Sequence, residues 1–302
     1  MSREVTIAGV SISRPEKEMY PATDEAVAVT KADVAGYYAD LAEAMLPHLR
    51  GRPISMQRFP DGIEGSSFYE KKVPGHFPDF VTRVEVDTAD GAQQQVTIED
   101  QRTLVYLADQ ACLTPHVWLA TAEHLHQPNQ LIIDLDPSVP GLAAVRRATT
   151  AVGELLDEIG LTSFVKTTGS RGYHVLVPLR PERDFDGVRE FARSFAQVLI
   201  ARAPDLLTLE ARKNKRGERV LVDIQRNAYG QTAVPPYVLR ARPGAPVATP
   251  IGWDEVSRVA PGGHTIRSIK RRLAQIDDPW AGIGRRRQTL TKAAERLRRL
   301  TD

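Results

Sequence analysis

The sequence has little of several features that mark secreted and membrane proteins. Its 302 residues include one cysteine, Cys112, which excludes an intrachain disulfide and a zinc site made of several cysteines. No run of about 18 apolar residues occurs, so no segment predicts a membrane-spanning helix. The first residues also lack the apolar stretch of a secretory signal. We therefore expect the chain to work in a reducing, cytoplasmic compartment.

Charge is nearly balanced overall but unevenly distributed. The formal net charge is +2, yet the segment Ile266–Asp302 holds eleven Lys or Arg against four Asp or Glu, and the remainder is slightly acidic. A basic tail on an acidic body indicates either a polyanionic partner or a solvated helix, and composition leaves both open. The hydrophobic fraction of 42% suffices for one large domain or two small ones.

Local patterns predict alternating strands and helices. Thr30 is a suitable N-cap for a helix over Lys31–Leu49, and Val5–Ile12 predicts a short strand. Further strands are expected within residues 54–59, 66–72, 81–86, 131–136, 163–179 and 219–224, and further helices over residues 103–112, 141–160 and 185–204. We expect an α/β fold with a mixed central sheet, flanking helices and a smaller N-terminal lobe.

Three aspartates end apolar strand segments. Asp134 and Asp136 end the run Leu131–Asp136, and alternate strand residues point to the same face. Asp223 lies in a second apolar run, Val220–Ile224. Carboxylates on neighbouring strands can hold one or two hard divalent cations, as two-metal phosphoryl transfer requires. The alternative is that Asp134 or Asp136 caps the helix that follows.

A glycine-rich turn and a basic loop are candidates for phosphate binding. In Thr167–His174 two glycines free the backbone to approach a phosphate, and Ser170, Arg171 and His174 could converge on it. The Gly-Lys-Ser/Thr of a Walker A loop is absent, and a tight hairpin with an incidental histidine is the alternative. Five of the eight residues in Arg212–Arg219 are basic, which suits a phosphate backbone or a solvated charge run.

Several motifs occur together in one order. They are Glu16–Thr23, the stretch from Val29 to Pro53, Phe68–Lys72, Leu107–Trp118, Leu131–Pro137, Lys166–Leu179, Val220–Asn227 and Val234–Pro250. In this combination the chain resembles the polymerase domain of bacterial ATP-dependent DNA ligase D and its stand-alone relatives, the primase-polymerases of the archaeo-eukaryotic primase superfamily. The resemblance implies a primase-like catalytic domain over residues 1–256, with a lobe to about residue 105 and a core over residues 106–256, followed by a basic helical tail over residues 257–302.

The resemblance also implies roles for individual residues. Asp134, Asp136 and Asp223 match the three catalytic carboxylates that hold two Mn²⁺ or Mg²⁺ ions. Residues matching nucleotide-binding positions are Ser170, Arg171, His174, His116 and Arg240, with Arg171 standing where the family usually has lysine. Lys17 and Lys31 match lysines that recognise a downstream 5′-phosphate. Residues matching DNA or template contacts are Arg58, Phe68, Lys71 and Arg216.

The function that the resemblance implies is template-directed nucleotidyl transfer that fills short gaps in DNA break repair, by non-homologous end joining or excision repair, in a bacterial, nucleoid-associated setting. Nucleoside triphosphates would be the substrates, ribonucleotides would be preferred, and a Ku-like end-binding protein and a ligase would be partners. No K-x-D-G ligase motif occurs, so we expect a stand-alone polymerase or an excised domain, and the basic tail favours the former. Three alternatives stay open: a primase that starts chains de novo, a non-catalytic DNA-end-binding module, and a metal-dependent phosphoesterase.

Overall fold

The computed structural model describes residues 5–300, which divide into two compact units. Unit 1 consists of residues 5–123, 232–248 and 264–272, and unit 2 of residues 124–231, 249–263 and 273–300. The chain therefore passes from one unit to the other at five points. The lobe that we expected to end near residue 105 corresponds to a unit that continues to Glu123 and includes two later segments.

Unit 2 is built on a six-stranded sheet with the strand order β13-β14-β10-β12-β11-β16. The strands are β10 (Gln130–Asp136), β11 (Phe164–Thr167), β12 (Tyr173–Pro178), β13 (Leu207–Thr208), β14 (Val220–Asp223) and β16 (Pro250–Ile251). β13 and β14 pair in parallel and the other neighbours pair antiparallel. The predicted mixed α/β fold is thereby confirmed.

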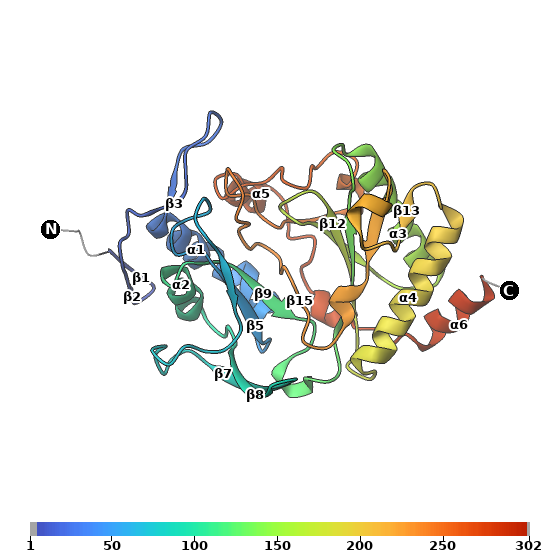
Figure 1. Cartoon of the computed structure of the whole chain (residues 1–302), viewed down its shortest axis with the longest axis horizontal. Helices are drawn as coiled ribbons and strands as arrows, with labels where there is room; N and C mark the ends of the chain where they lie inside the picture. Colours follow the sequence, from blue (N-terminus) through green and yellow to red (C-terminus); the bar gives the residue numbers. More distant parts are fainter. Residues whose placement is uncertain (1–4, 301–302) are drawn as a thin grey trace. The chain divides into compact units, whose positions relative to one another are not determined.

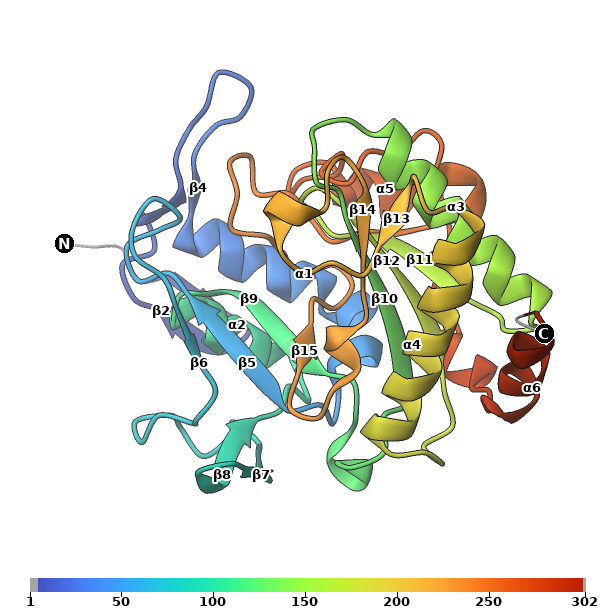
Figure 2. The same cartoon turned by 45° about the vertical axis from the view of Figure 1, so that its right-hand side comes forward.

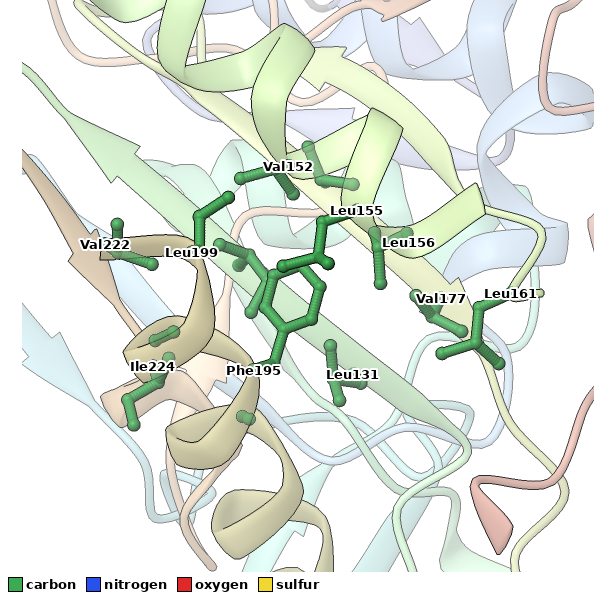
Figure 3. Packing of buried hydrophobic residues seen from close by; sticks show 14 of the residues in the cluster. Leu131, Val152, Leu155, Leu156, Leu161, Val177, Phe195, Leu199, Val222 and Ile224 are labelled. Carbon is green, nitrogen blue, oxygen red and sulfur yellow. The ribbon is translucent and has the colours of Figure 1, made fainter. Parts of the chain in front are cut away.

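Two helices cover one face of this sheet. They are α3 (Ala143–Glu158), which connects β10 to β11, and α4 (Phe185–Arg202), and both lie along the same side of the strands (Figure 2). Leu131, Ile133 and Leu135 of β10 point towards them and are at most 1% exposed. Figure 3 shows this core with Phe195 of α4 at its centre. Because side chains alternate along a strand, Ile132, Asp134 and Asp136 face the opposite side of the sheet.

The end of the chain adds to the same core. Helix α6 (Thr291–Arg299) inserts Ala293 and Leu297 into the cluster formed by α3, α4 and the sheet. The Trp280 side chain is 1% exposed, and its Nε1 donates a hydrogen bond to the Val165 carbonyl oxygen at 2.9 Å. Part of the basic tail is therefore integrated into unit 2 by apolar packing.

Unit 1 contains a four-stranded sheet with the order β15-β9-β5-β6 and two packed helices (Figure 1). The strands of this sheet are β5 (Ile54–Arg58), β6 (Phe68–Glu70), β9 (Cys112–Trp118) and β15 (Thr232–Ala233). The helices are α1 (Lys31–Leu49) and α2 (Gln101–Asp109). Unit 1 also contains three two-stranded pairs: β1 (Val5–Ile7) with β2 (Val10–Ile12), β3 (Glu18–Tyr20) with β4 (Val29–Thr30), and β7 (Arg83–Thr88) with β8 (Gly91–Val96). Helix α5 (Ile269–Gln275) begins in unit 1 and ends in unit 2. Within residues 5–300, no helix is both long enough and apolar enough to span a membrane.

Local sequence patterns predicted the start of α1 correctly but the first strand incorrectly. Thr30 caps α1 as expected: the Asp33 backbone N–H donates to Thr30 Oγ1 at 3.2 Å, and the Thr30 N–H donates to Asp33 Oδ2 at 2.8 Å. The single strand predicted over Val5–Ile12 is wrong, because Ala8 and Gly9 have φ angles of 47° and 74° and turn the chain into a hairpin. Two successive positive φ angles are typical of the tight turns that join antiparallel strands.

Candidate active site

The three aspartates lie together on the face of the unit 2 sheet that α3 and α4 leave uncovered. Asp134 of β10 stands directly opposite Asp223 of β14 on one side and opposite His174 of β12 on the other. Directly opposed residues of antiparallel strands share a face, with Cβ atoms about 4.5–5.5 Å apart. Asp136 follows two residues after Asp134 on the same face. Lys166 of β11, opposite His174, extends this row and is 1% exposed.

Basic side chains pair with two of the three aspartates, Asp134 and Asp136. Arg171 and Arg216 approach the two oxygens of Asp136 at 3.1 and 3.3 Å. His174 Nε2 and Arg226 Nε approach Asp134 at 3.4 and 3.6 Å. Across the described part of the chain, no three His, Cys, Asp or Glu side chains converge as metal ligands do. The backbone thus brings three carboxylates to one face. The oxygens of Asp134 and Asp136 point to guanidinium and imidazole groups, whereas Asp223 Oδ1 accepts a hydrogen bond from the Gln225 backbone N–H at 2.8 Å.

The pKa values follow from burial and from these neighbours. Burial raises the pKa of Asp134, but His174, Arg226 and Lys166 outweigh it and bring the pKa to about 2. Burial, assisted by the Asp134 charge, raises the pKa of Asp223 above its usual value. Burial and the charge of Lys166 lower the pKa of His174. Asp134 is therefore held ionised, while Asp223 lacks enough positive charge to offset its burial.

The turn between β11 and β12 brings the predicted phosphate-binding residues beside the aspartates. Thr168 closes it by donating from its backbone N–H and its hydroxyl to the Gly172 carbonyl oxygen, at 3.0 and 2.9 Å. Ser170 lies half-buried in this turn, and Arg171 is 50% exposed. His174 is buried, and its Nδ1 has no hydrogen-bond partner among residues 5–300.

Gly172 allows the close approach of this turn to β10. A Cβ atom at this position would lie 1.9 Å from the Leu135 carbonyl oxygen, a backbone atom that cannot move aside alone. We expect Gly172→Ala to lower the free energy of unfolding by about 1–3 kcal/mol, the usual cost of overpacking. Urea unfolding measures this. Gly36→Ala in α1 is the matched control, because its Cβ meets nothing within 4 Å and alanine favours a helix. Equal stability of the two variants would contradict the close approach.

Arg216 is the most constrained residue of the basic loop. Its Nε donates to the Glu210 carbonyl oxygen at 2.8 Å and its Nη2 to the Ala211 carbonyl oxygen at 2.6 Å, while Nη1 reaches Asp136. The side chain is 8% exposed. Arg216 therefore lies beside the aspartates of unit 2, and its contact with DNA stays a prediction.

His116 and Arg240, also predicted to bind the nucleotide, belong to unit 1. His116 of β9 is 7% exposed, its Nε2 lies 3.3 Å from Gln57 Oε1, and its ring meets the exposed Tyr69 edge to face. Arg240 is half-buried, and its charge acts on the buried hydroxyl of Tyr20. These two residues are therefore not on the structural unit that holds the aspartates.

The two lysines predicted to bind a 5′-phosphate differ in their surroundings within unit 1. The Lys17 side chain is 20% exposed and pairs with exposed Asp61 at 2.8 Å. Lys31 is 4% exposed, and its Nζ donates to Ser13 Oγ at 3.0 Å and to the Asp109 carbonyl oxygen at 2.9 Å. Burial lowers the pKa of Lys31 against the opposing effect of Asp109. Lys17 is thus accessible, whereas Lys31 is held within the unit.

The predicted DNA-contact residues gather around the edge strand β6. The Arg58 guanidinium lies 5.6 Å from the centre of the Phe68 ring and 2.6 Å from Glu70. Phe68 is 45% exposed, and Lys71 just after the strand is exposed. An exposed aromatic ring beside cations is the surface that stacks on bases and follows a phosphate backbone.

Sequence reasoning missed Lys166, Arg226 and Asp109. Lys166 is a single charge in an apolar strand, and such a residue is rarely fully buried without a purpose, so it could have been noticed. Arg226 follows Asp223 by three residues in a 3₁₀ turn, Gln225–Asn227, which directs it back to Asp134. Asp109 gave no local signal, because its partners Ser13 and Lys31 are distant in the sequence.

Comparisons with known proteins agree with this geometry. The family model for the LigD primase-polymerase domain matches residues 30–280. The chain is 33% identical to the multifunctional non-homologous end joining protein LigD of Pseudomonas aeruginosa, over 98% of this chain and 35% of that protein. It is 31% identical to the bifunctional non-homologous end joining protein LigD of Bacillus subtilis, over 83% of this chain and 41% of that protein.

A solved structure is similar over nearly its whole length. It is the polymerase domain of Mycobacterium tuberculosis ligase D in complex with DNA, with a TM-score of 0.84 and 30% identity, covering 92% of this chain and 99% of that chain. The chain spans about a third of the length of the first curated relatives that it matches. Because the family model matches more than half of the residues, the chain belongs to the LigD primase-polymerase domain family.

Proposed function

We propose that the chain is a DNA-dependent nucleotidyltransferase that adds nucleotides to a primer 3′ end and fills short gaps in broken DNA. The observation that supports this best is the register of β10 between β14 and β12, with Asp134 opposite both Asp223 and His174. Non-homologous end joining is the repair pathway named for the relatives, and we extend it to this chain as part of the proposal.

Two divalent cations, Mn²⁺ or Mg²⁺, would be held by Asp134, Asp136 and Asp223. The donor set fits, because carboxylate oxygens are the ligands that these ions prefer and the raised pKa of Asp223 indicates a deficit of positive charge. When bound, such ions lower the pKa of an attacking hydroxyl and neutralise the leaving pyrophosphate. Arg171 and Arg216 would have to turn away from Asp136 to free its oxygens.

The phosphates of the incoming nucleotide would be oriented by Ser170, Arg171 and His174. Arg171 is half-exposed, so it can move from Asp136 to a phosphate at little cost. The Nδ1 atom of buried His174 has no hydrogen-bond partner in the described residues and is suited to a ligand oxygen. His116 and Arg240 of unit 1 match nucleotide-binding positions in the family resemblance, and a nucleotide-binding role for these two residues is part of the proposal.

Unit 1 would bind the DNA strand that carries the 5′-phosphate. Lys17 is the accessible cation for a 5′-phosphate, and Lys31 is a buried positive charge near it. Arg58, Phe68 and Lys71 would contact the DNA beside it, Phe68 by stacking. The proposal also includes a preference for ribonucleotides as substrates. It includes a Ku-like end-binding protein and a ligase as partners.

Extension of a labelled primer across a short gap tests the proposal. The assay uses Mn²⁺ or Mg²⁺, ribo- or deoxyribonucleotides, and a downstream strand with a 5′-phosphate or a 5′-hydroxyl. We expect templated extension, faster with ribonucleotides and with the 5′-phosphate. Extension without any primer on a single-stranded template would instead support a primase.

Lys17→Met should remove most of the stimulation by the 5′-phosphate. A hydrogen bond to a charged group contributes about 1.5–3 kcal/mol, so we expect a loss of about tenfold or more on the phosphorylated substrate and little change on the hydroxyl substrate. Lys270→Met is the matched control, because Lys270 forms an exposed ion pair with Asp40 in the same unit. An equal loss on both substrates would exclude phosphate recognition by Lys17.

The arginine pairing of the aspartates favours one second candidate, a DNA-end-binding module without catalysis. Such a module would keep Asp136 bound to Arg171 and Arg216. It would bind gapped DNA in a 5′-phosphate-dependent way and would extend no primer with either metal. That pair of results would replace the polymerase proposal.

A further inference from the structure

An unusually basic surface lies near the end of unit 2. Between Arg285 and Arg299 the sequence carries seven Lys or Arg and one acidic residue, Glu295. The family match ends at residue 280, so this segment lies outside the residues that the family model matches. We call the following residues the basic patch: Arg285, Arg286, Arg287, Lys292 and Arg299. All five are exposed.

The charges of the basic patch are not balanced by acids. Over residues 5–300, no ion pair within 4.0 Å joins any of the five to an Asp or Glu, whereas Arg202 of the same unit binds Glu158 through two nitrogens. Three of the patch residues are consecutive, so like charges are held close together. Such a concentration of one sign raises the local potential and attracts a polyanion.

The patch is displayed on a fixed support. Gln288 donates from its side chain to the Thr162 carbonyl oxygen and accepts from the Thr162 N–H, both at 2.8 Å. Its backbone N–H donates to the Pro178 carbonyl oxygen at 3.0 Å, which ties Arg285–Arg287 to the end of β12. Leu290, Ala293 and Leu297 anchor α6 in the core. A ligand therefore does not have to order this segment.

The patch lies away from the aspartates within unit 2. It adjoins the Pro178 end of β12, four residues or about 13 Å along the strand from His174. Helix α6, which carries Lys292 and Arg299, packs against α4 on the face of the sheet opposite to Asp134. A polyanion bound to the basic patch therefore contacts a different surface of unit 2 from one whose end reaches the aspartates.

We propose that the basic patch binds the phosphate backbone of duplex DNA without regard to sequence, as a second DNA-binding surface of unit 2. Four of its five members are arginines, whose planar guanidinium groups bind phosphate oxygens through two parallel hydrogen bonds. A DNA duplex presents a continuous line of phosphates, about one charge per 1.7 Å of axis, which matches a run of adjacent arginines. Protein surfaces, in contrast, usually intersperse charges of both signs.

The test measures binding of the full chain to a blunt duplex of about 30 base pairs with 5′-hydroxyl ends, by fluorescence anisotropy across a salt series. Nucleotide is omitted and EDTA is present, so the result does not depend on catalysis. The variant is Arg285→Gln, Arg286→Gln, Arg287→Gln and Lys292→Gln combined. We expect affinity at low salt to fall about tenfold or more, and the slope of log K against log salt to fall by about 0.9 for each phosphate that the variant no longer neutralises.

Two double variants that remove the same number of charges separate the effect of position from the effect of net charge. Arg286→Gln with Arg287→Gln should weaken binding clearly, while Arg147→Gln with Arg193→Gln, two exposed arginines of α3 and α4, should change it less than about twofold. Unchanged affinity and slope in the fourfold variant, with an unchanged melting curve, would overturn the proposal. Displacement of the duplex by poly-glutamate at equal charge would overturn it too, in favour of an acidic polypeptide partner.

Discussion

Asp134→Asn is expected to abolish templated primer extension, by about 10³-fold or more, while leaving the fold intact. The substitution keeps the shape of the side chain but removes the charge at the centre of the row from Asp223 to His174. Stabilisation of transition-state charge at such a site amounts to several kcal/mol, and each 1.36 kcal/mol is a factor of ten in rate. Single-turnover extension on gapped DNA measures the loss.

Glu158→Gln is the control for this variant. Glu158 also pairs with a basic residue of unit 2, Arg202, but both side chains are more than 40% exposed. They belong to α3 and α4 and not to the face of the sheet that carries the aspartates. It should extend primers at the parent rate. Asp134→Asn should bind gapped DNA nearly as well as the parent, since the acids do not bind phosphate. Extension by Asp134→Asn within tenfold of the parent would rule out a central role for this carboxylate.

Asp109→Ala is expected to destabilise unit 1 by about 3–5 kcal/mol, the usual cost of breaking one partner out of a buried ion pair. Asp109 Oδ1 accepts hydrogen bonds from the Ser13 N–H and hydroxyl, at 2.7 and 2.8 Å, and lies 3.5 Å from Lys31 Nζ. Both charged side chains are at most 9% exposed. The alanine would leave Lys31 as an uncompensated buried charge. Urea unfolding measures the difference, and Asp40→Ala, at an exposed pair with Lys270, should cost less than about 1 kcal/mol.

The pH dependence of the stability lost in Asp109→Ala, which we call the deficit, identifies the cause of that loss. Burial lowers the pKa of Lys31 from its usual 10.5, and loss of Asp109 should lower it further. A lysine whose folded-state pKa lies below its unfolded value binds fewer protons when folded, so stability rises with pH between the two values. The deficit of Asp109→Ala should therefore shrink as the pH is raised from neutral towards 10.5. A deficit that stays constant would attribute the loss to the Ser13 hydrogen bonds instead.

Local signals predicted the helices and the polar face well. The helix Lys31–Leu49 was predicted with its cap, because Thr30 and Asp33 form a capping box from residues three apart. The common face of Asp134 and Asp136 follows from strand periodicity alone. The position of Asp223 opposite Asp134 depends on the order of the strands in the sheet. Strand order is not encoded by local sequence patterns, so the sequence could only suggest this pairing.

The strand β9 shows where local rules fail. It contains Pro115, and proline normally argues against a central strand because it has no N–H to donate. In the structure β9 lies between β5 and β15, but β15 pairs only with Val117 and Trp118. Among residues 5–300, therefore, no second strand runs beside Pro115. The burial of Lys31 was likewise invisible locally, since its partner Asp109 lies 78 residues away.

The five passages of the chain between the units have a consequence for protein engineering and for folding. Neither unit is a continuous piece of sequence, so no single cut yields either one alone, and exchanging one unit with a relative needs five junctions. Segments such as residues 232–248 must find partners more than a hundred positions earlier, as Leu239 does with Thr114. Closing such long loops is entropically slow, and residues up to Arg272 must have left the ribosome before unit 1 can be completed.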